Sequence, residues 1–139
     1  TYTYAFLVDG EVNSENLEIS ASYTYLLDGE TYTVSGSTNY NITHGGIALI
    51  YNNGSISSIR QLESVTLSQL SDLYAMAGNK KYMLADDMEV LLKDSSSSNT
   101  YYVTTLSEIN DEDYRLTGWY DDLDCAAGGR IRILVAVPK

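Results

Sequence analysis

The chain has 139 residues, of which 13 are tyrosine and 1 is proline, and it carries 8 basic against 19 acidic side chains, for a formal net charge of −11. This length is typical of one domain or of two small fused units. A negative field repels the phosphates of nucleic acids and the headgroups of anionic lipids, so neither nucleic-acid binding nor membrane contact is expected. Cations and amine-bearing polymers remain as partners.

The residue types favour a mainly β fold. Tyr, Thr and Val are frequent, and aromatic and β-branched side chains fit the pleated, half-buried surface of a sheet. Three dipeptides that readily adopt the positive φ angles of tight turns each lie between apolar or alternating runs: Asp9-Gly10, Asp28-Gly29 and Asn53-Gly54. We therefore expect three hairpins in the first part of the chain.

One segment departs from the β pattern. Thr66 and Gln69 have the spacing of a capping box, and Gly78-Asn79 offers a left-handed stop. Between them, apolar residues recur at intervals of three and four, as on one face of an amphipathic helix: Leu67, Leu70, Leu73, Tyr74 and Ala77. We expect a single α-helix near residues 66–77, with its apolar face packed against a sheet.

The remaining residues are typical of strands and turns. Strands are expected at residues 81–84, 88–93, 100–105, 114–120 and 130–137. In the last of these, the alternation predicts that Ile131 and Ile133 are buried and that Arg130 and Arg132 are exposed. The expected fold class is mainly β, with antiparallel hairpins that form one or two small barrel- or sandwich-like units beside the helix.

The expected domain organisation is a single β-rich domain over residues 1–139, or two small OB-like or barrel-like units, 1–65 and 79–139, joined by the helix. The sequences around the first two Asp-Gly turns, TYTYAFLVDGEV and SYTYLLDGETYTV, are similar. Duplication of a small β unit explains this similarity, and chance among β sequences explains it almost as well.

The usual catalytic signatures are missing from the sequence. It holds no phosphate-binding glycine loop, serine nucleophile elbow or His-Glu-x-x-His motif. Cys125 is the only cysteine, which excludes an internal disulfide and a cysteine-based zinc site. His44 is the only histidine, and a single histidine in a loop is usually a surface or packing residue. We therefore expect a protein that is not an enzyme.

Two acidic loops, 110–113 and 121–124, are candidates for a bound cation. Ca²⁺ takes six to eight oxygen ligands, so clustered carboxylates are necessary for a site but do not suffice. Asp121, Asp122 and Asp124 are the candidate metal ligands, although neither loop has the EF-hand spacing. No cofactor other than Ca²⁺ is indicated.

Aromatic side chains are the candidate ligand-binding residues: Trp119, Tyr120 and Tyr101. Aromatic faces stack on the apolar faces of sugar rings, while a role in the core is the competing interpretation. In the strand 114–120, alternation places Trp119 with Arg115 and Thr117 on the polar face. Partial exposure of Trp119 is expected, which suits either a glycan or a protein interface.

The second half of the chain resembles a known kind of module. The runs KYMLADDMEVLLKD, YYVTTLSEI, YRLTGWYDD and GGRIRILVAV, which extend from Lys80 to Val137, are similar to small β modules of exported Gram-positive proteins that also carry surface-layer homology repeats. The resemblance implies a location in the cell wall or outside the cell, attachment through other segments, and a structural or adhesive role. It assigns no catalytic residue. Because the chain opens on Thr1, we expect it to be a segment of a longer protein.

Three functions follow in order. The first is a non-enzymatic structural or interaction module of a bacterial cell-surface or secreted protein, with a cell-wall polymer, a glycan or another surface protein as its partner. The second is a carbohydrate-binding module that uses exposed Tyr and Trp. The third is a hydrolase with a carboxylate pair, because such pairs leave no fixed spacing in a sequence.

Overall fold

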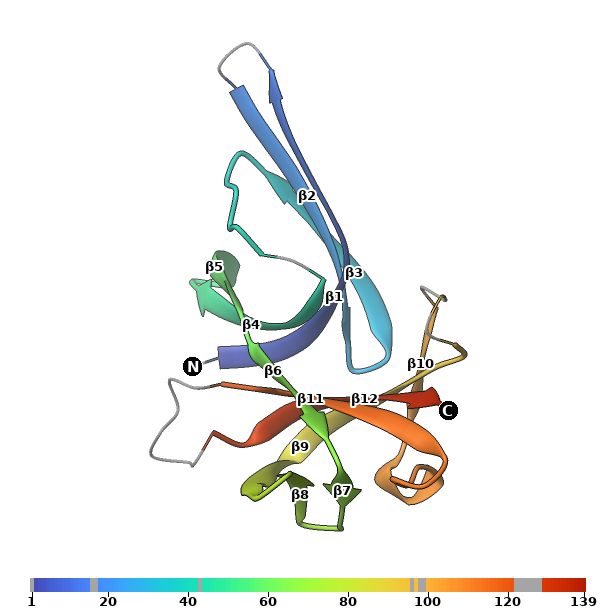
Figure 1. Ribbon diagram of the computed structural model, residues 1–139. Coiled ribbons are helices and arrows are strands. Elements are labelled where there is room, and N and C mark those ends of the chain that lie inside the picture. Colours follow the sequence, from blue (N-terminus) through green and yellow to red (C-terminus); the bar gives the residue numbers. More distant parts are fainter. Residues whose placement is uncertain (1, 16–17, 43, 96, 98–99, 122–128) are drawn as a thin grey trace. The chain divides into compact units, whose positions relative to one another are not determined.

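The computed structural model describes residues 2–15, 18–42, 44–95, 97, 100–121 and 129–139. The chain divides into two compact units, Thr1–Leu62 and Glu63–Lys139. Both are built from strands, and the only helix in the described ranges is a short 3-10 turn, η1, at Leu106–Glu108 (Figure 1). Among these residues there is no helix with the length and hydrophobicity needed to span a bilayer.

The first unit is one antiparallel sheet with the strand order β3-β2-β1-β4-β5. β1 pairs with β4 through its first residues and with β2 through the rest, so β1 and β2 continue together as a long hairpin (Figure 1). The bounds are β1 Tyr2–Glu15, β2 Glu18–Leu27, β3 Glu30–Gly36, β4 Gly45–Asn52 and β5 Ser55–Gln61.

Two of the three predicted hairpin turns are confirmed, and one is wrong. Asp28 and Gly29 both have positive φ, as do Asn53 and Gly54, and each pair joins two antiparallel strands. Asp9-Gly10 instead lies inside β1, next to a register shift between Leu7 and Asp9. The dipeptide there follows a β-bulge, where the ring of Tyr23 on β2 covers Gly10.

A loop covers the core of the first unit. The core consists of the inward side chains of four strands: Ala5, Leu7, Ala21, Tyr23, Tyr25, Ile47, Leu49 and Ile59. Tyr40 and Ile42, from the loop after β3, pack against this cluster. The backbone N–H of Tyr40 donates a hydrogen bond of 3.0 Å to the hydroxyl of Tyr23. The phenol therefore anchors the loop that closes the core.

The second unit is a mixed sheet that curves into a half-barrel. Its order is β6-β11-β12-β9-β8-β7, with β10 paired to β9 outside this path. β6 pairs with β11 and β7 pairs with β8, and only Ser68 separates β6 from β7. Residues 63–70 thus provide the first and the last strand in this order. The bounds are β6 Glu63–Leu67, β7 Gln69–Leu70, β8 Tyr74–Ala77, β9 Lys80–Lys93, β10 Tyr101–Thr104, β11 Tyr114–Tyr120 and β12 Ile131–Pro138.

The α-helix predicted near residues 66–77 is wrong. This segment forms the end of β6, then β7 and β8, and Gly78 lies in the turn from β8 to β9 with positive φ. The apolar residues do not share a face, because Leu73 is 71% exposed while Ala75, outside the predicted stripe, is fully buried. Pairing with β11 and β9 thus determines which residues face inward.

The prediction that Arg130 and Arg132 are exposed is also wrong. β12 is a central strand, antiparallel to β11 and parallel to β9, and both of its faces are buried. The side chain of Arg132 is 16% exposed and lies 3.9 Å from a carboxylate oxygen of Asp87. Arg130 donates to the carbonyl oxygen of Leu84 at 3.3 Å. Burial of Ile131 and Ile133, in contrast, is confirmed.

Candidate functional site

A short loop of the second unit forms one wall of a cleft. Residues 71–73 connect β7 to β8, and the backbone N–H of Ser71 donates to the carbonyl oxygen of Tyr74 at 2.8 Å. The backbone N–H of Leu84 on β9 donates to the carbonyl oxygen of Leu73 at 3.0 Å. These two bonds hold Asp72 and Leu73 beside β9, with both side chains exposed.

An irregularity in β9 forms the opposite wall. Leu84 pairs with Ile131 and Glu89 pairs with Ile133. The segment of β9 between Leu84 and Glu89 is therefore longer than the segment of β12 between Ile131 and Ile133. The extra residues bulge from the ladder, and two of them, Asp86 and Met88, line the same cleft as Asp72 and Leu73. A bulge of this kind redirects side chains that would otherwise alternate along the strand.

The cleft between these walls has a volume of about 390 Å³. This lies within the range of about 300 to 1,000 Å³ that is usual for small-ligand sites. Two carboxylates, two hydroxyls and an apolar surface line it: Asp72, Leu73, Leu84, Ala85, Asp86, Met88, Val90, Thr104, Thr105 and Leu106. A second hollow of about 110 Å³ shares Asp72 and Leu106 and extends toward Asp111.

The charge of the site is negative. No lysine or arginine is among the residues that line either hollow. In the described ranges, the carboxylates of Asp72 and Asp86 have no hydrogen bond and no ion pair, whereas Asp111 accepts a hydrogen bond of 2.8 Å from the backbone N–H of Leu70. Asp111 therefore has a structural role, while Asp72 and Asp86 are available to a ligand.

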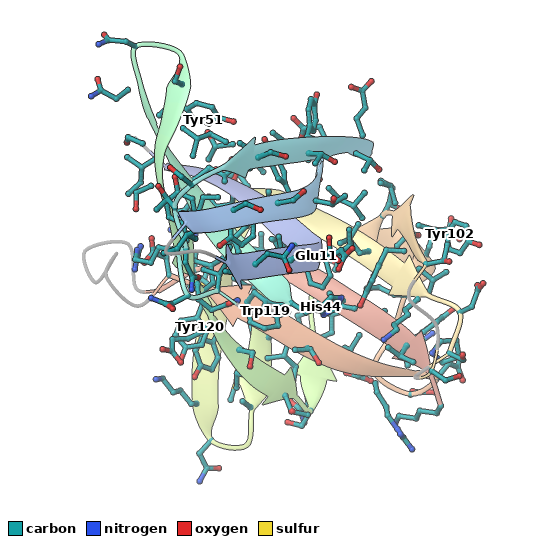
Figure 2. The ribbon with its side chains drawn as sticks, turned by 90° about the horizontal axis from the view of Figure 1, so that it is seen from above. Glu11, His44, Tyr51, Tyr102, Trp119 and Tyr120 are labelled. Atoms are coloured by element: carbon teal, nitrogen blue, oxygen red, sulfur yellow. The ribbon has the colours of Figure 1, made fainter. Side chains whose placement is uncertain are left out.

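The three aromatic residues predicted to bind a ligand do not form one site. Tyr101 is on β10, while Trp119 and Tyr120 are on β11, and β9 and β12 separate these strands in the sheet. Trp119 is half-buried. Tyr120 packs against the core, with its ring centroid 5.1 Å from that of Tyr82. Figure 2 labels Trp119 and Tyr120, which are both on β11.

Tyr101 has a different environment. The ammonium of Lys93 lies 5.5 Å from the centroid of its ring, and burial raises the pKa of its phenol. Its neighbour Tyr102, labelled in Figure 2, is an exposed residue of β10, as is Val103 beside it. Tyr101 and Trp119 therefore lie on strands that are not neighbours in the sheet, and their roles in ligand binding stay predictions.

The predicted metal ligands are only partly described. Asp121 is buried at the end of β11, and Asp122 and Asp124 lie outside the described residues. In the other acidic loop, the side-chain oxygen of Asn110 accepts from the backbone N–H groups of Glu112 and Asp113 at 3.0 and 2.6 Å, which makes the loop a side-chain-stabilised turn. The part of the chain that is described holds no group of three or more His, Cys, Asp or Glu side chains arranged for a metal ion. Ca²⁺ binding stays a prediction.

The single histidine and the single cysteine of the chain differ in how far the structure describes them. The ring of His44 packs edge-on against Phe6, with centroids 5.2 Å apart and an interplanar angle of 85°. Cys125 lies outside the described residues. The contact of His44 with Phe6 fits the packing role expected for a single histidine.

The cleft residues Asp72 and Asp86 were missed in the sequence because their proximity depends on the bond between Leu73 and Leu84 and on the pairing of β9 with β12. One signal was present. The pair Asp86-Asp87 follows the apolar run Met83-Leu84-Ala85, and two adjacent acidic side chains in a regular central strand would place one of them on each face of the sheet. No comparable signal marks Asp72.

Comparison with known proteins finds no family model, no curated protein and no solved structure that matches this chain. The likeness of residues 80–137 to modules of Gram-positive surface proteins therefore stays a prediction.

Proposed function

We propose that this chain is a non-enzymatic interaction module of an exported bacterial surface protein, and that the cleft of its second unit binds an amine-bearing group of a cell-wall polymer. The observation that carries the proposal is the pairing of two ligand-accessible carboxylates, Asp72 and Asp86, with an apolar floor in one cleft. Carboxylates attract an ammonium group, and Leu73 and Met88 provide contacts for the carbon atoms that bear it.

The strand order supports a binding role. We count β6 and β7 together as strand 1 and number β8, β9, β11 and β12 as strands 2 to 5. The order of neighbours around the sheet is then 1-2-3-5-4-1, and strands 3 and 5 are parallel. We infer from this order that the second unit is an OB-like barrel. Such barrels bind oligosaccharides and oligonucleotides on the face of strands 2 and 3 and on the adjoining loops, one of which corresponds to residues 71–73. The acidity of this unit, with thirteen acidic and seven basic side chains, disfavours oligonucleotides.

The test is binding of a β-1,4-linked glucosamine tetramer, a soluble probe with one amine per sugar, measured by titration calorimetry at low ionic strength. The variant Asp72→Asn/Asp86→Asn should weaken binding about tenfold or more, because both carboxylates that face the ammonium are lost. Asp94→Asn changes charge in the same unit on an exposed residue outside both hollows, and should have little effect. Equal losses from the cleft variant and from Asp94→Asn would show that only the overall charge matters, and the proposal would then fail.

For the hydrolase alternative, the candidate catalytic carboxylates among the described residues lie in the same cleft. Asp72 and Asp86 are the two carboxylates that line it, and a carboxylate pair is the minimal equipment of a glycosidase. Turnover of the glucosamine tetramer by the wild-type chain, lost in Asp72→Asn, would favour this alternative over the non-enzymatic module. Binding without turnover is the expected result.

A further inference from the structure

Three tyrosines gather on the first unit, each from a different strand. Tyr25 on β2 and Tyr32 on β3 are directly opposite in the strand register, and their rings are stacked with centroids 5.6 Å apart and an interplanar angle of 20°. Tyr51 on β4 shares a hydrogen bond with the side chain of Tyr25. A register shift between Ile50 and Tyr51 marks a bulge, which redirects the Tyr51 side chain. We name Tyr25, Tyr32 and Tyr51 the tyrosine cluster.

The cluster combines a buried ring with two exposed rings. Tyr25 is 5% exposed, whereas Tyr32 and Tyr51 are 42% and 41% exposed. β3 is the edge strand of its sheet, so Tyr25 braces one face of the Tyr32 ring and no further strand of the described sheet lies beyond Tyr32. In Figure 2, Tyr51 is labelled beside the β4–β5 hairpin. A ring that already packs against a neighbouring side chain on one face, and is exposed on the other, loses little conformational freedom when a ligand stacks on it.

Polar groups surround these rings. The hydroxyl of Tyr32 donates a hydrogen bond of 3.1 Å to a carboxylate oxygen of Glu30, which itself is exposed. That bond raises the pKa of Tyr32, and burial followed by the bond with Tyr51 raises the pKa of Tyr25 to about 12. The phenols of Tyr25 and Tyr32 therefore remain neutral hydroxyl groups at physiological pH. Glu30 keeps acceptor capacity for the hydroxyl groups of a ligand.

We propose that the tyrosine cluster is a second binding site, which takes a pyranose ring of a neutral glycan: the sugar stacks on Tyr32, Tyr51 flanks it, and Glu30 accepts hydrogen bonds from its hydroxyl groups. The apolar face of a pyranose needs an aromatic surface, and its equatorial hydroxyls need the acceptors and donors at the rim. The first unit carries six acidic side chains and one basic side chain, so an anionic glycan is repelled and a neutral glycan is not.

This site differs from the cleft of the second unit in residues, in unit and in ligand charge. It needs no ammonium group, and its residues are absent from the lining of the cleft. Failure of either proposal therefore leaves the other intact, because the Asp72 and Asp86 substitutions act on one and the Tyr32 substitutions act on the other.

The experiment uses the whole 139-residue chain. Saturation-transfer NMR and titration calorimetry are carried out with three neutral probes, cellotetraose, N-acetylated chitotetraose and mannotetraose. At least one probe should bind, with saturation strongest at the ring C–H protons. Tyr32→Ala should weaken that binding about tenfold or more, while Tyr32→Phe should retain binding within about threefold because the ring face is kept. Glu30→Gln should also weaken binding, since the charged acceptor is replaced by a neutral amide.

The matched control is Tyr102→Ala, which removes an exposed tyrosine from the second unit and should leave binding of the neutral probes unchanged. Circular dichroism and thermal unfolding of each variant establish that the fold is retained, and Tyr51→Ala provides a second test on another strand. Absence of binding to all three probes overturns the proposal. So does a Tyr32→Ala variant that binds as well as Tyr102→Ala, or a Tyr32→Phe variant that is as weak as Tyr32→Ala.

Discussion

Gly118 on β11 lies against Ile131 on β12 so closely that a Cβ added to the glycine would stand 2.7 Å from the Cδ1 atom of Ile131 and 3.2 Å from the Cδ1 atom of Leu67. Both neighbours belong to the buried core of the second unit. Gly118 does not have positive φ, so its importance comes from space rather than from backbone conformation. The absence of a side chain lets three strands of the half-barrel approach one another.

Gly118→Ala should therefore destabilise the second unit. The added methyl group forces Ile131 out of its position, and overpacking of this kind costs about 1 to 3 kcal/mol. Urea unfolding followed by circular dichroism measures the loss. The control is Gly36→Ala at the end of β3, where an added Cβ meets nothing within 4 Å, and stability should be unchanged or slightly higher. Equal effects of the two substitutions would contradict this explanation.

Asp111→Ala should loosen the loop beside β7. The backbone N–H of Leu70 would lose its acceptor, and because Asp111 is only half-buried the expected cost is about 1 kcal/mol, below the range of about 1.5 to 3 kcal/mol for hydrogen bonds to charged groups. Faster amide exchange of Leu70 is the direct readout. Glu112→Ala removes an exposed acidic residue from the same loop and should leave this exchange rate unchanged.

Tyr23→Phe should release the loop that covers the first core. The substitution keeps the buried ring and removes the hydroxyl that accepts from the Tyr40 backbone N–H. A net loss of about 0.5 to 1.5 kcal/mol is expected, together with faster amide exchange of Tyr40. Unchanged protection of Tyr40 in the Phe variant would show that packing of Tyr40 and Ile42 suffices to hold the loop.

Ionisation of Tyr25 should reduce stability at alkaline pH. Burial and the hydrogen bond with Tyr51 raise its pKa from 10.0 to about 12, so the folded protein holds this proton more tightly than the unfolded chain. The corresponding stability is fully present below pH 10.0 and is lost as the pH rises to about 12. Denaturant unfolding at several pH values should show a shallower loss for Tyr25→Phe than for the wild type. Identical slopes would exclude Tyr25 as a contributor.

The features that were predicted correctly depend on residues close together in the chain. Asp28-Gly29 and Asn53-Gly54 supply two consecutive positive φ angles, which a two-residue hairpin requires. The strand predicted at residues 114–120 has the bounds of β11, Tyr114–Tyr120. Asp9-Gly10 offers the same turn chemistry, but continued pairing of β1 with β2 on both sides of the dipeptide keeps it inside a strand.

The candidate sites depend on residues that are distant in the chain. Asp72 and Asp86 line one cleft because a loop is bound to β9 at Leu84 and because β9 bulges against β12. Tyr25 and Tyr51 meet because β2 and β4 flank β1 in one curved sheet. Neither relationship leaves a spacing in the sequence, whereas the predicted ligand-binding set, Trp119, Tyr120 and Tyr101, rests on residue type and, for Trp119, on alternation along one strand.

The sequence by itself determined the mainly β class, the acidity and two tight turns, because composition and local φ preferences act within a few residues. Only the tertiary structure decided that residues 66–77 form short strands and a loop instead of a helix, that both faces of β12 are buried, and which side chains share a cleft. The physical reason is that a strand gains its hydrogen bonds and its burial from partners distant in the chain. The spacing of Leu67, Leu70 and Leu73 fits a helix only while those partners are unknown.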